Sequence, residues 1–168
     1  MTLSARTWPL PDHWCWHDAP VAPGAAVVFD LDGVLSDAAS RQRFLEPGRQ
    51  DWEGFFDACG EDPLIEEVAC LLALLDPELQ IVLLTGRPVR VQPQTRTWLE
   101  RFDLRWDLLI MRDYGDYTAA RDFKRGTVHD LRSVGFDLRL AFEDDRRNLT
   151  MFREEGVTCV YIHSGYYD

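Results

Sequence analysis

Short apolar runs alternate along the chain with segments whose apolar residues recur every three or four positions. Runs of this kind, rich in Val, Ile and Leu and bounded by polar residues, predict buried strands. They occupy residues 25–29, 80–84, 106–111, 138–142 and 157–162. Because strands that alternate with helices form parallel sheets, the pattern predicts an α/β fold. We expect a three-layer, Rossmann-like parallel sheet with helices on both faces.

The segments between the predicted strands carry helix start and stop signals. Asp51 is expected to cap a helix that ends at Gly60, and Pro63 to open a helix that runs through Leu75. A turn and a short helix precede them, so that residues 36–78 form a small helical insert after the first strand. Three later helices are predicted at 93–102, 119–134 and 147–155.

An aromatic stripe lies on one face of the first insert helix, at Trp52, Phe55 and Phe56. Large aromatic residues at helical spacing are more typical of a core than of an exposed surface. We therefore expect these three side chains to be buried, with a platform for substrate as the alternative.

Residues 1–24 show neither helical nor strand periodicity and precede the domain proper, residues 25–168. The prolines predict an extended arm, and Trp8, Trp14 and Trp16 predict that it is held against the domain surface. An arm that binds a partner is the alternative. His13, Cys15 and His17 lack a fourth ligand for a metal site.

Composition limits the functions that the chain can have. Its formal net charge of −11 argues against wrapping long nucleic acid through bulk electrostatics. The four cysteines are scattered without metal-binding spacing, and the first residues lack the pattern of a signal peptide. The longest apolar run, 69–75, is too short to span a bilayer. These features predict a cytoplasmic protein with reduced thiols and no membrane contact.

Two acids follow the first predicted strand directly. Because strand side chains alternate, Asp30 and Asp32 leave the strand on the same side. Adjacent carboxylates repel each other unless a cation or a shared proton joins them. The pair therefore predicts a Mg²⁺ site in which one carboxylate acts as nucleophile. A polar exit from the strand into a turn is the alternative.

Further polar groups follow the later strands. A turn of Thr85, Gly86 and Arg87 after the second strand suits an oxyanion. Lys124 is the one lysine among 18 basic residues, which favours a role as a compact charge beside a phosphate or carboxylate. A parallel sheet gathers the ends of its strands along one edge. At the same edge we also expect the three acids that end or follow the fourth predicted strand, Glu143, Asp144 and Asp145.

Together these motifs resemble those of haloacid dehalogenase-like phosphohydrolases. The shared features are DLDGVL at 30–35, TGR after a strand, an isolated lysine and a pair of acids after a later strand, over residues 25–165. The chain is most similar to the 3′-phosphatase domain of phage-type polynucleotide kinases. That likeness rests on Arg41, eleven residues after Asp30, on TGR, and on the closing pattern that runs from 144 to 165.

The resemblance implies a mechanism and a role for each motif. Asp30 would attack phosphorus and form an aspartyl-phosphate, and Asp32 would act as general acid and then general base. Mg²⁺ would be held by Asp30, by the backbone carbonyl of Asp32, and by Asp144 or Asp145. The implied phosphate or substrate contacts are Thr85, Gly86, Lys124, Arg41 and Arg87.

The resemblance leaves the substrate open. Glu143 stands where the family usually has an apolar residue, and the sequence contains no GxxxxGK[ST] motif of a P-loop kinase. The phosphatase would then work alone or with a separate kinase or ligase partner. The predicted function is a Mg²⁺-dependent phosphatase acting on a polynucleotide or nucleotide 3′-phosphate. A small-molecule phosphatase such as a nucleotidase is one alternative, and a non-catalytic, receiver-like phosphate-binding module is another.

Overall fold

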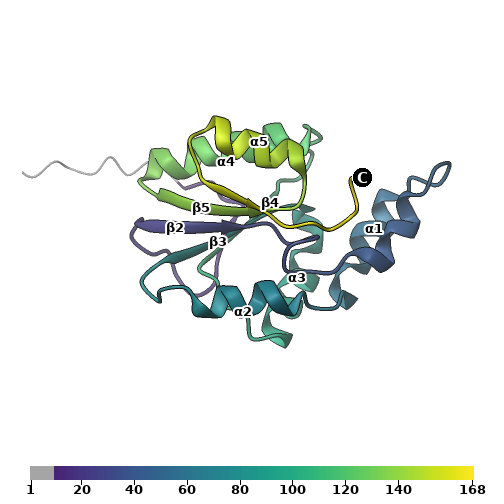
Figure 1. The fold of residues 1–168 in the computed structure, drawn as a ribbon, viewed down its shortest axis with the longest axis horizontal. Coiled ribbons are helices and arrows are strands. Elements are labelled where there is room, and N and C mark those ends of the chain that lie inside the picture. The colour runs from purple at the N-terminus through teal and green to yellow at the C-terminus, as the bar shows by residue number, and fades with distance from the viewer. Residues whose placement is uncertain (1–9) are drawn as a thin grey trace, which may run out of the picture.

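A mostly parallel sheet forms the middle layer of the computed structural model, which describes residues 10–168 (Figure 1). The strand order is β1-β4-β3-β2-β5-β6. This confirms the predicted α/β Rossmann-like class. The parallel strands are β2 (Ala25–Phe29), β3 (Gln80–Pro88), β4 (Leu108–Arg112), β5 (Asp137–Glu143) and β6 (Cys159–Tyr161).

The N-terminal arm contributes an edge strand that the sequence pattern did not predict. Strand β1 (Trp14–Trp16) pairs antiparallel with β4, so the sheet is mixed rather than purely parallel. Three residues are too few to show strand alternation. The rings of Trp14 and Trp16 both pack against Phe136. Trp8, also assigned to the arm, lies outside the described residues.

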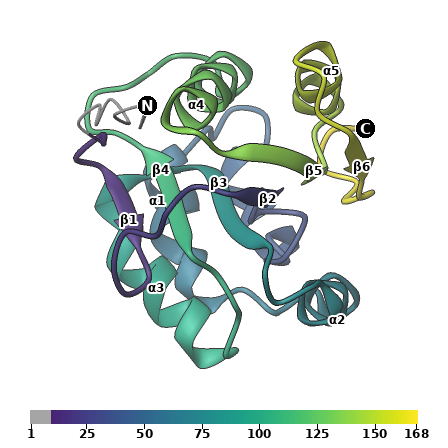
Figure 2. The same ribbon diagram turned by 90° about the vertical axis from the view of Figure 1, so that its left-hand side faces the viewer.

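Helices cover both faces of the sheet, as the continuous apolar runs of the strands require. In Figures 1 and 2, α4 (Ala120–Val134) and α5 (Arg146–Glu154) lie on one face, and α2 (Glu66–Leu74) and α3 (Gln92–Arg101) on the other. Along β2, Ala26 and Val28 belong to the core beneath α4 and α5. Val27 and Phe29 belong to the core beneath α2 and α3, on the opposite face of the sheet.

The insert between β2 and β3 contains 3₁₀ helices as well as α-helices. Its elements are η1 (Ala39–Leu45), α1 (Trp52–Asp57), η2 (Ala58–Glu61) and α2, and a third 3₁₀ turn, η3 (Val89–Val91), follows β3. The predicted cap is confirmed, because the Asp51 side chain accepts a hydrogen bond from the Gly54 amide at 2.8 Å.

The predicted start of α2 at Pro63 is wrong. Leu64 forms a bridge with Ser36, and the Ile65 amide donates to the Leu35 carbonyl at 2.8 Å. These contacts hold the segment after Pro63 extended, so the helix begins only at Glu66.

The expectation that the aromatic stripe is buried holds for only part of it. Phe55 is buried, Phe56 is half-buried, and Trp52 is 55% exposed. The reason is the position of α1, which lies beyond one end of the sheet rather than on a face of it (Figure 1). Only one side of this helix is therefore covered.

The strand order places a change of direction at β2. From β2 the chain adds β3 and β4 on one side, and then returns to add β5 and β6 on the other. Open α/β sheets bind ligands outside the carboxyl ends of the strands at such a point. Among residues 10–168, none of the helices has the length and apolar character needed to cross a bilayer.

Candidate active site

The turn after β2 brings its two acids to the carboxyl edge of the sheet. The Asp30 amide still donates to the Phe142 carbonyl at 3.1 Å, so Asp30 is anchored like a residue of the strand. The chain then turns at Gly33, which has a φ of +81° and donates its amide to the Ser36 carbonyl at 2.8 Å. A positive φ of this kind favours glycine.

A second reason requires glycine at this position. A Cβ atom on residue 33 would lie 2.0 Å from Oδ2 of Asp144, which is far inside van der Waals contact. Asp144 follows β5, the neighbour of β2. The missing side chain therefore lets the acid after β5 reach the acids after β2.

Three carboxylates converge at this point. Oxygens of Asp30, Glu143 and Asp144 all lie within 4.8 Å of one another. Both side-chain oxygens of Asp144 are buried and have no hydrogen-bond partner among residues 10–168. Such a set of hard oxygen donors, with an uncompensated buried carboxylate, fits a divalent cation.

The crowding of these acids changes their proton affinity in the metal-free protein. Burial, and then the negative charge of Glu143, raises the pKa of Asp30 well above its ordinary value. Burial, and then the charge of Asp30, raises the pKa of Asp144 to about 7. A bound cation would favour the ionised forms of both side chains.

Lys124 supplies the positive charge within this cluster. Its Nζ lies 2.7 Å from Oε2 of Glu143 and 3.1 Å from Oδ2 of Asp30. Burial opposes its charge, but the two carboxylates outweigh that effect and raise the pKa of Lys124 above its ordinary value. The side chain, almost completely buried near the start of α4, is therefore a permanent cation beside Asp30.

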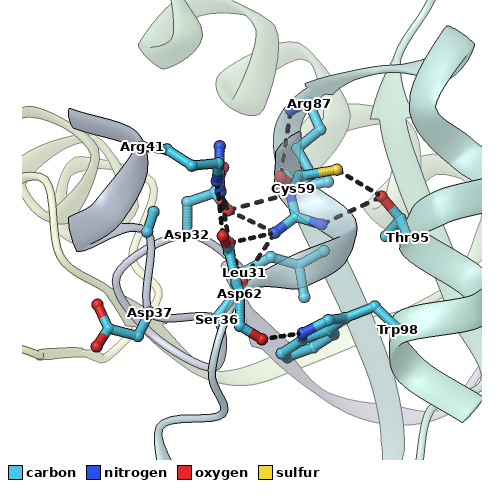
Figure 3. A network of polar contacts seen from close by, with 12 residues as sticks. Leu31, Asp32, Ser36, Asp37, Arg41, Cys59, Asp62, Arg87, Thr95 and Trp98 are labelled. Atoms are coloured by element: carbon cyan, nitrogen blue, oxygen red, sulfur yellow. Dashed lines mark hydrogen bonds and ion pairs between the residues drawn. The ribbon is translucent and has the colours of Figure 1, made fainter. Parts of the chain in front are cut away.

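Asp32 is held by two arginines rather than by the acid cluster (Figure 3). Its Oδ1 accepts hydrogen bonds from Nη2 of Arg41 and Nη2 of Arg87, both at 2.6 Å, and from Nε of Arg87 at 3.0 Å. Among the described residues, Oδ2 has no such partner, and the side chain is 20% exposed. One carboxylate oxygen is thus fixed and the other is free to face a substrate.

The two arginines also determine the charge of Asp32. Burial opposes ionisation, but the guanidinium groups of Arg87 and Arg41 outweigh it and hold the pKa of Asp32 below its ordinary value. Asp32 is therefore ionised at neutral pH in the resting protein. Donating a proton requires that it first take one up when an anionic substrate approaches.

Asp62 completes this arrangement and was not predicted from the sequence. Its side chain is buried and accepts hydrogen bonds from Nε of Arg41 at 2.8 Å and from the Ser36 hydroxyl at 2.5 Å. Its backbone carbonyl accepts the indole N–H of Trp98 at 2.8 Å. It lies in the irregular link before α2, where no motif draws attention to it.

The arginines thus differ from the direct phosphate contacts that we expected. Neither Arg41 nor Arg87 lines the cavity above Asp30, and both are almost completely buried. Their donors are directed to Asp32, to Asp62, to Ser36 and to the hydroxyl of Thr95. In this structure they position Asp32.

The expected turn at Thr85 is instead a continuation of β3. The strand runs to Pro88, which is paired with Arg112, and its register is irregular after Leu84. Thr85 and Gly86 nevertheless both line the cavity with Asp30 and Lys124. The Thr85 hydroxyl oxygen accepts from the Arg87 amide at 3.2 Å, so its proton remains available to an anion.

Asp145 lies apart from the acid cluster in its interactions. It caps α5 by accepting from the Arg147 amide at 2.9 Å, and its Oδ2 accepts from Nη2 of Arg147 at 2.8 Å. Of the two acids considered as ligands, Asp144 lies in the cluster with Asp30, whereas Asp145 caps the helix and also lines the cavity with Asp30 and Lys124.

A cavity of about 1060 Å³ opens over these groups. Its lining includes Asp30, Asp32 and Lys124, and also Arg112, which was not predicted as a site residue. Nη1 of Arg112 donates to the Thr118 carbonyl at 2.7 Å, while its buried Nε has no hydrogen-bond partner among the described residues. An arginine at a strand end carries no motif that would identify it from sequence alone.

Comparison with known families agrees with this geometry. A family model described as "Polynucleotide kinase PNKP phosphatase domain" matches residues 24–167. The chain belongs to this family. It is therefore a phosphatase domain of the haloacid dehalogenase superfamily, as its motifs predicted.

Solved structures share the fold. The chain resembles a chain of the Pnkp1/Rnl/Hen1 RNA repair complex with a TM-score of 0.71 and 24% identity, over 89% of this chain and 45% of that one. It also resembles the class C acid phosphatase from Bacillus anthracis with tungstate bound, with a TM-score of 0.59 and 14% identity over 88% of this chain and 69% of that one. A haloacid dehalogenase-like hydrolase from Streptococcus pneumoniae is similar too, with a TM-score of 0.58 and 15% identity over 83% of this chain and 84% of that one.

Proposed function

We propose that this phosphatase removes the 3′-phosphate of a polynucleotide or nucleotide, with Mg²⁺ as cofactor and a phosphoaspartate on Asp30 as intermediate. The convergence of Asp30, Asp144 and the buried ammonium of Lys124 beneath one cavity supports this proposal most strongly. A nucleophile, a cation site and a phosphate ligand are thereby adjacent.

Asp30 and Asp32 would divide the chemistry between them. A carboxylate oxygen of Asp30 forms a bond to phosphorus while the bond from phosphorus to the ester oxygen breaks. The departing oxygen takes a proton from Asp32. A water molecule then returns a proton to Asp32 and attacks phosphorus, which releases inorganic phosphate and regenerates Asp30. Fixing Oδ1 of Asp32 leaves Oδ2 as the oxygen that carries the proton.

The cation would be held by Asp30, Asp144 and the backbone carbonyl of Asp32. Of the two acids after β5, we propose Asp144 as the ligand, because its oxygens are buried without other partners whereas Asp145 binds Arg147. When bound, Mg²⁺ would neutralise the charge between the anionic nucleophile and the anionic phosphate.

The transferring phosphate would be held by groups that line the cavity. The hydroxyl of Thr85, the backbone of Gly86 and the ammonium of Lys124 face the same space as Asp30, and Arg112 adds a guanidinium. Donors of this kind stabilise the charge that develops on the phosphate oxygens in the transition state.

The relatives support a nucleic-acid end as substrate. The structures of the Pnkp1/Rnl/Hen1 complex are described as an RNA repair complex, and this chain spans about half the length of the chains that it matches there. We propose that a kinase with which it cooperates lies outside these 168 residues, since they contain no P-loop motif. We propose the same for a ligase, because the family match over residues 24–167 is to a phosphatase domain.

A substrate panel tests this proposal. Phosphate release with Mg²⁺ would be compared between a 3′-phosphorylated single-stranded oligonucleotide, a 3′-mononucleotide and a 5′-mononucleotide. We expect the two 3′-phosphates to be hydrolysed and the 5′-phosphate to be hydrolysed much more slowly. A preference for the 5′-mononucleotide would contradict the proposal and favour a nucleotidase, a function with which the net charge of −11 is compatible.

The intermediate can be tested separately. In Asp32→Asn the second step lacks its base. With p-nitrophenyl phosphate, whose leaving group needs no proton from Asp32, the first step still occurs, so the phosphorylated form of the Asp30 peptide should accumulate and be detectable by mass spectrometry. Asp137→Asn, which changes an exposed carboxylate outside the cavity, is the matched control and should not accumulate it.

A further inference from the structure

Aromatic side chains surround the mouth of the catalytic cavity. Trp52, Phe55 and Phe56 line it from α1, and Tyr114 and Tyr117 line it from the loop after β4. Three of these rings are exposed, Trp52 by 55%, Tyr114 by 94% and Tyr117 by 93%. Exposed aromatic residues that gather at one opening indicate a binding surface.

The cavity is much larger than the reacting group requires. Its volume of about 1060 Å³ is in the range of pockets that hold whole small molecules, which is roughly 300–1,000 Å³. A phosphate occupies only the part of it near Asp30 and Lys124. The aromatic part is therefore available to the group that carries the phosphate.

Trp52 packs on the two phenylalanines of α1 and forms a platform at the cavity. Its ring stacks on Phe56 with centroids 6.0 Å apart and planes at 29°, and it meets Phe55 edge-on at 5.8 Å and 76°. The exposed part of the indole is left free for a ligand. Phe55, which supports it, is itself buried.

The platform is tied to the catalytic acid through one residue. The Arg41 guanidinium lies 4.4 Å from the centre of the Phe55 ring and donates to the Phe55 carbonyl at 3.0 Å. The same side chain binds Oδ1 of Asp32 at 2.6 Å. Arg41 therefore fixes the position of α1 relative to Asp32, and so the distance between the platform and the reacting phosphate.

We propose that Trp52 stacks on the base of the nucleotide that carries the 3′-phosphate. This inference rests on the proposed function. A nucleobase is the planar group attached to such a phosphate, and every base has a face that can stack on an aromatic ring. The cavity lining includes Glu46, Glu53 and Arg90, and Arg90 donates to the Glu53 carbonyl. It therefore offers no continuous cationic track for further phosphodiesters, and recognition depends on the terminal base rather than on the backbone.

The test compares two single-stranded 3′-phosphorylated oligonucleotides, one with a normal terminal nucleotide and one whose terminal nucleotide is abasic. Stacking is worth roughly 1–3 kcal/mol per base, which converts to a kcat/KM ratio of about 5 to 150 between them in the wild type. We expect the ratio to approach one in Trp52→Ala and to be largely retained in Trp52→Phe. Leu74→Ala removes a still more exposed apolar side chain outside the cavity and should keep the wild-type ratio.

Two outcomes would overturn the inference alone. One is a ratio near one in the wild type although both oligonucleotides are hydrolysed, and the other is an undiminished ratio in Trp52→Ala. Failure to hydrolyse either oligonucleotide would overturn the proposed function instead. The abasic substrate distinguishes these cases, because its hydrolysis does not depend on a terminal base.

Discussion

At the scale of the residue, neighbouring groups give chemically identical carboxylates different properties. Asp30 and Asp144 lie in a buried, acidic cluster that favours their protonated forms, whereas Asp32 lies against two guanidinium groups that favour its ionised form. A nucleophile must be ionised and a proton donor protonated, so a bound cation would have to favour the ionised form of Asp30, and an approaching phosphate the protonated form of Asp32.

The raised pKa of Asp144 predicts how stability depends on pH in the metal-free protein. From pH ~4, where an unfolded Asp titrates, up to about 7, the folded state keeps a proton that the unfolded chain has lost. The free energy of unfolding should therefore fall as pH rises through this window, by about 1.4 kcal/mol per pH unit for one group. Urea denaturation at a series of pH values, with a chelator present to remove metal ions, measures this dependence.

The effect of Asp32 falls in a different window. Its pKa is lowered, so its contribution to stability is present above pH ~4 and is lost only as pH falls further.

The variant Asp144→Asn is the control for the predicted pH dependence. In this variant the decline of the free energy of unfolding between pH ~4 and about 7 should become shallower. An unchanged decline in that variant would show that another group causes it.

Glu143 provides a second prediction at this scale. It is completely buried, holds Lys124 at 2.7 Å and adjoins Asp30 and Asp144. Partners that surround metal ligands typically contribute about 10–100-fold to metal affinity or activity. Glu143→Gln should therefore raise the Mg²⁺ concentration for half-maximal activity by roughly that factor. A shift of less than twofold would mean that Glu143 only packs the strand end.

At the scale of the element, a buried ion pair joins the insert to the sheet. Asp62, before α2, accepts hydrogen bonds from Arg41 of η1 and from Arg87 of β3. Both arginines also donate to Asp32 after β2. Removing one partner of a buried pair leaves the other charge uncompensated, which costs far more than the loss of an exposed pair.

Asp62→Ala should therefore lower the free energy of unfolding by ~3–5 kcal/mol. Arg139→Ala removes a pair in which both side chains are 65% exposed and should cost at most ~1 kcal/mol. Chemical denaturation of the two variants beside the wild type measures both values. Equal effects would show that the Asp62 pair does not anchor the insert.

The same scale shows what sequence reasoning can reach. The five parallel strands and the acids after them were predicted, because apolar runs and strand-end motifs are local signals. The antiparallel β1 was missed, since three residues carry no periodicity. The start of α2 was misplaced because the bridge between Leu64 and Ser36 is a tertiary contact.

The site shows the same division. Asp30, Thr85, Lys124 and Asp144 were predicted from motifs, and the structure brings them together around one cavity or cluster. Asp62 and the exposure of Trp52 depend on how the insert packs, and no local pattern specifies that. The orientation of Arg41 and Arg87 toward Asp32 could not be predicted either, because it depends on Asp62.

At the scale of the whole molecule, a net charge of −11 opposes a polyanionic substrate. Salt screens this repulsion with a Debye length of about 10 Å at 0.1 M. Raising the ionic strength from about 0.01 M to about 0.1 M should therefore increase kcat/KM for a long 3′-phosphorylated oligonucleotide severalfold. A 3′-mononucleotide should respond less. A steep decrease with salt would instead indicate a cationic binding track.

The role of Asp30 is tested most directly by Asp30→Asn, assayed for phosphate release from a 3′-phosphorylated oligonucleotide with and without Mg²⁺. The wild type should release phosphate only with Mg²⁺, and the variant should lose at least ~10³-fold of that activity. Its circular dichroism spectrum should remain that of the wild type, because the substituted side chain has the same shape. Substantial Mg²⁺-dependent activity in Asp30→Asn would contradict the account, since another group would then be the nucleophile.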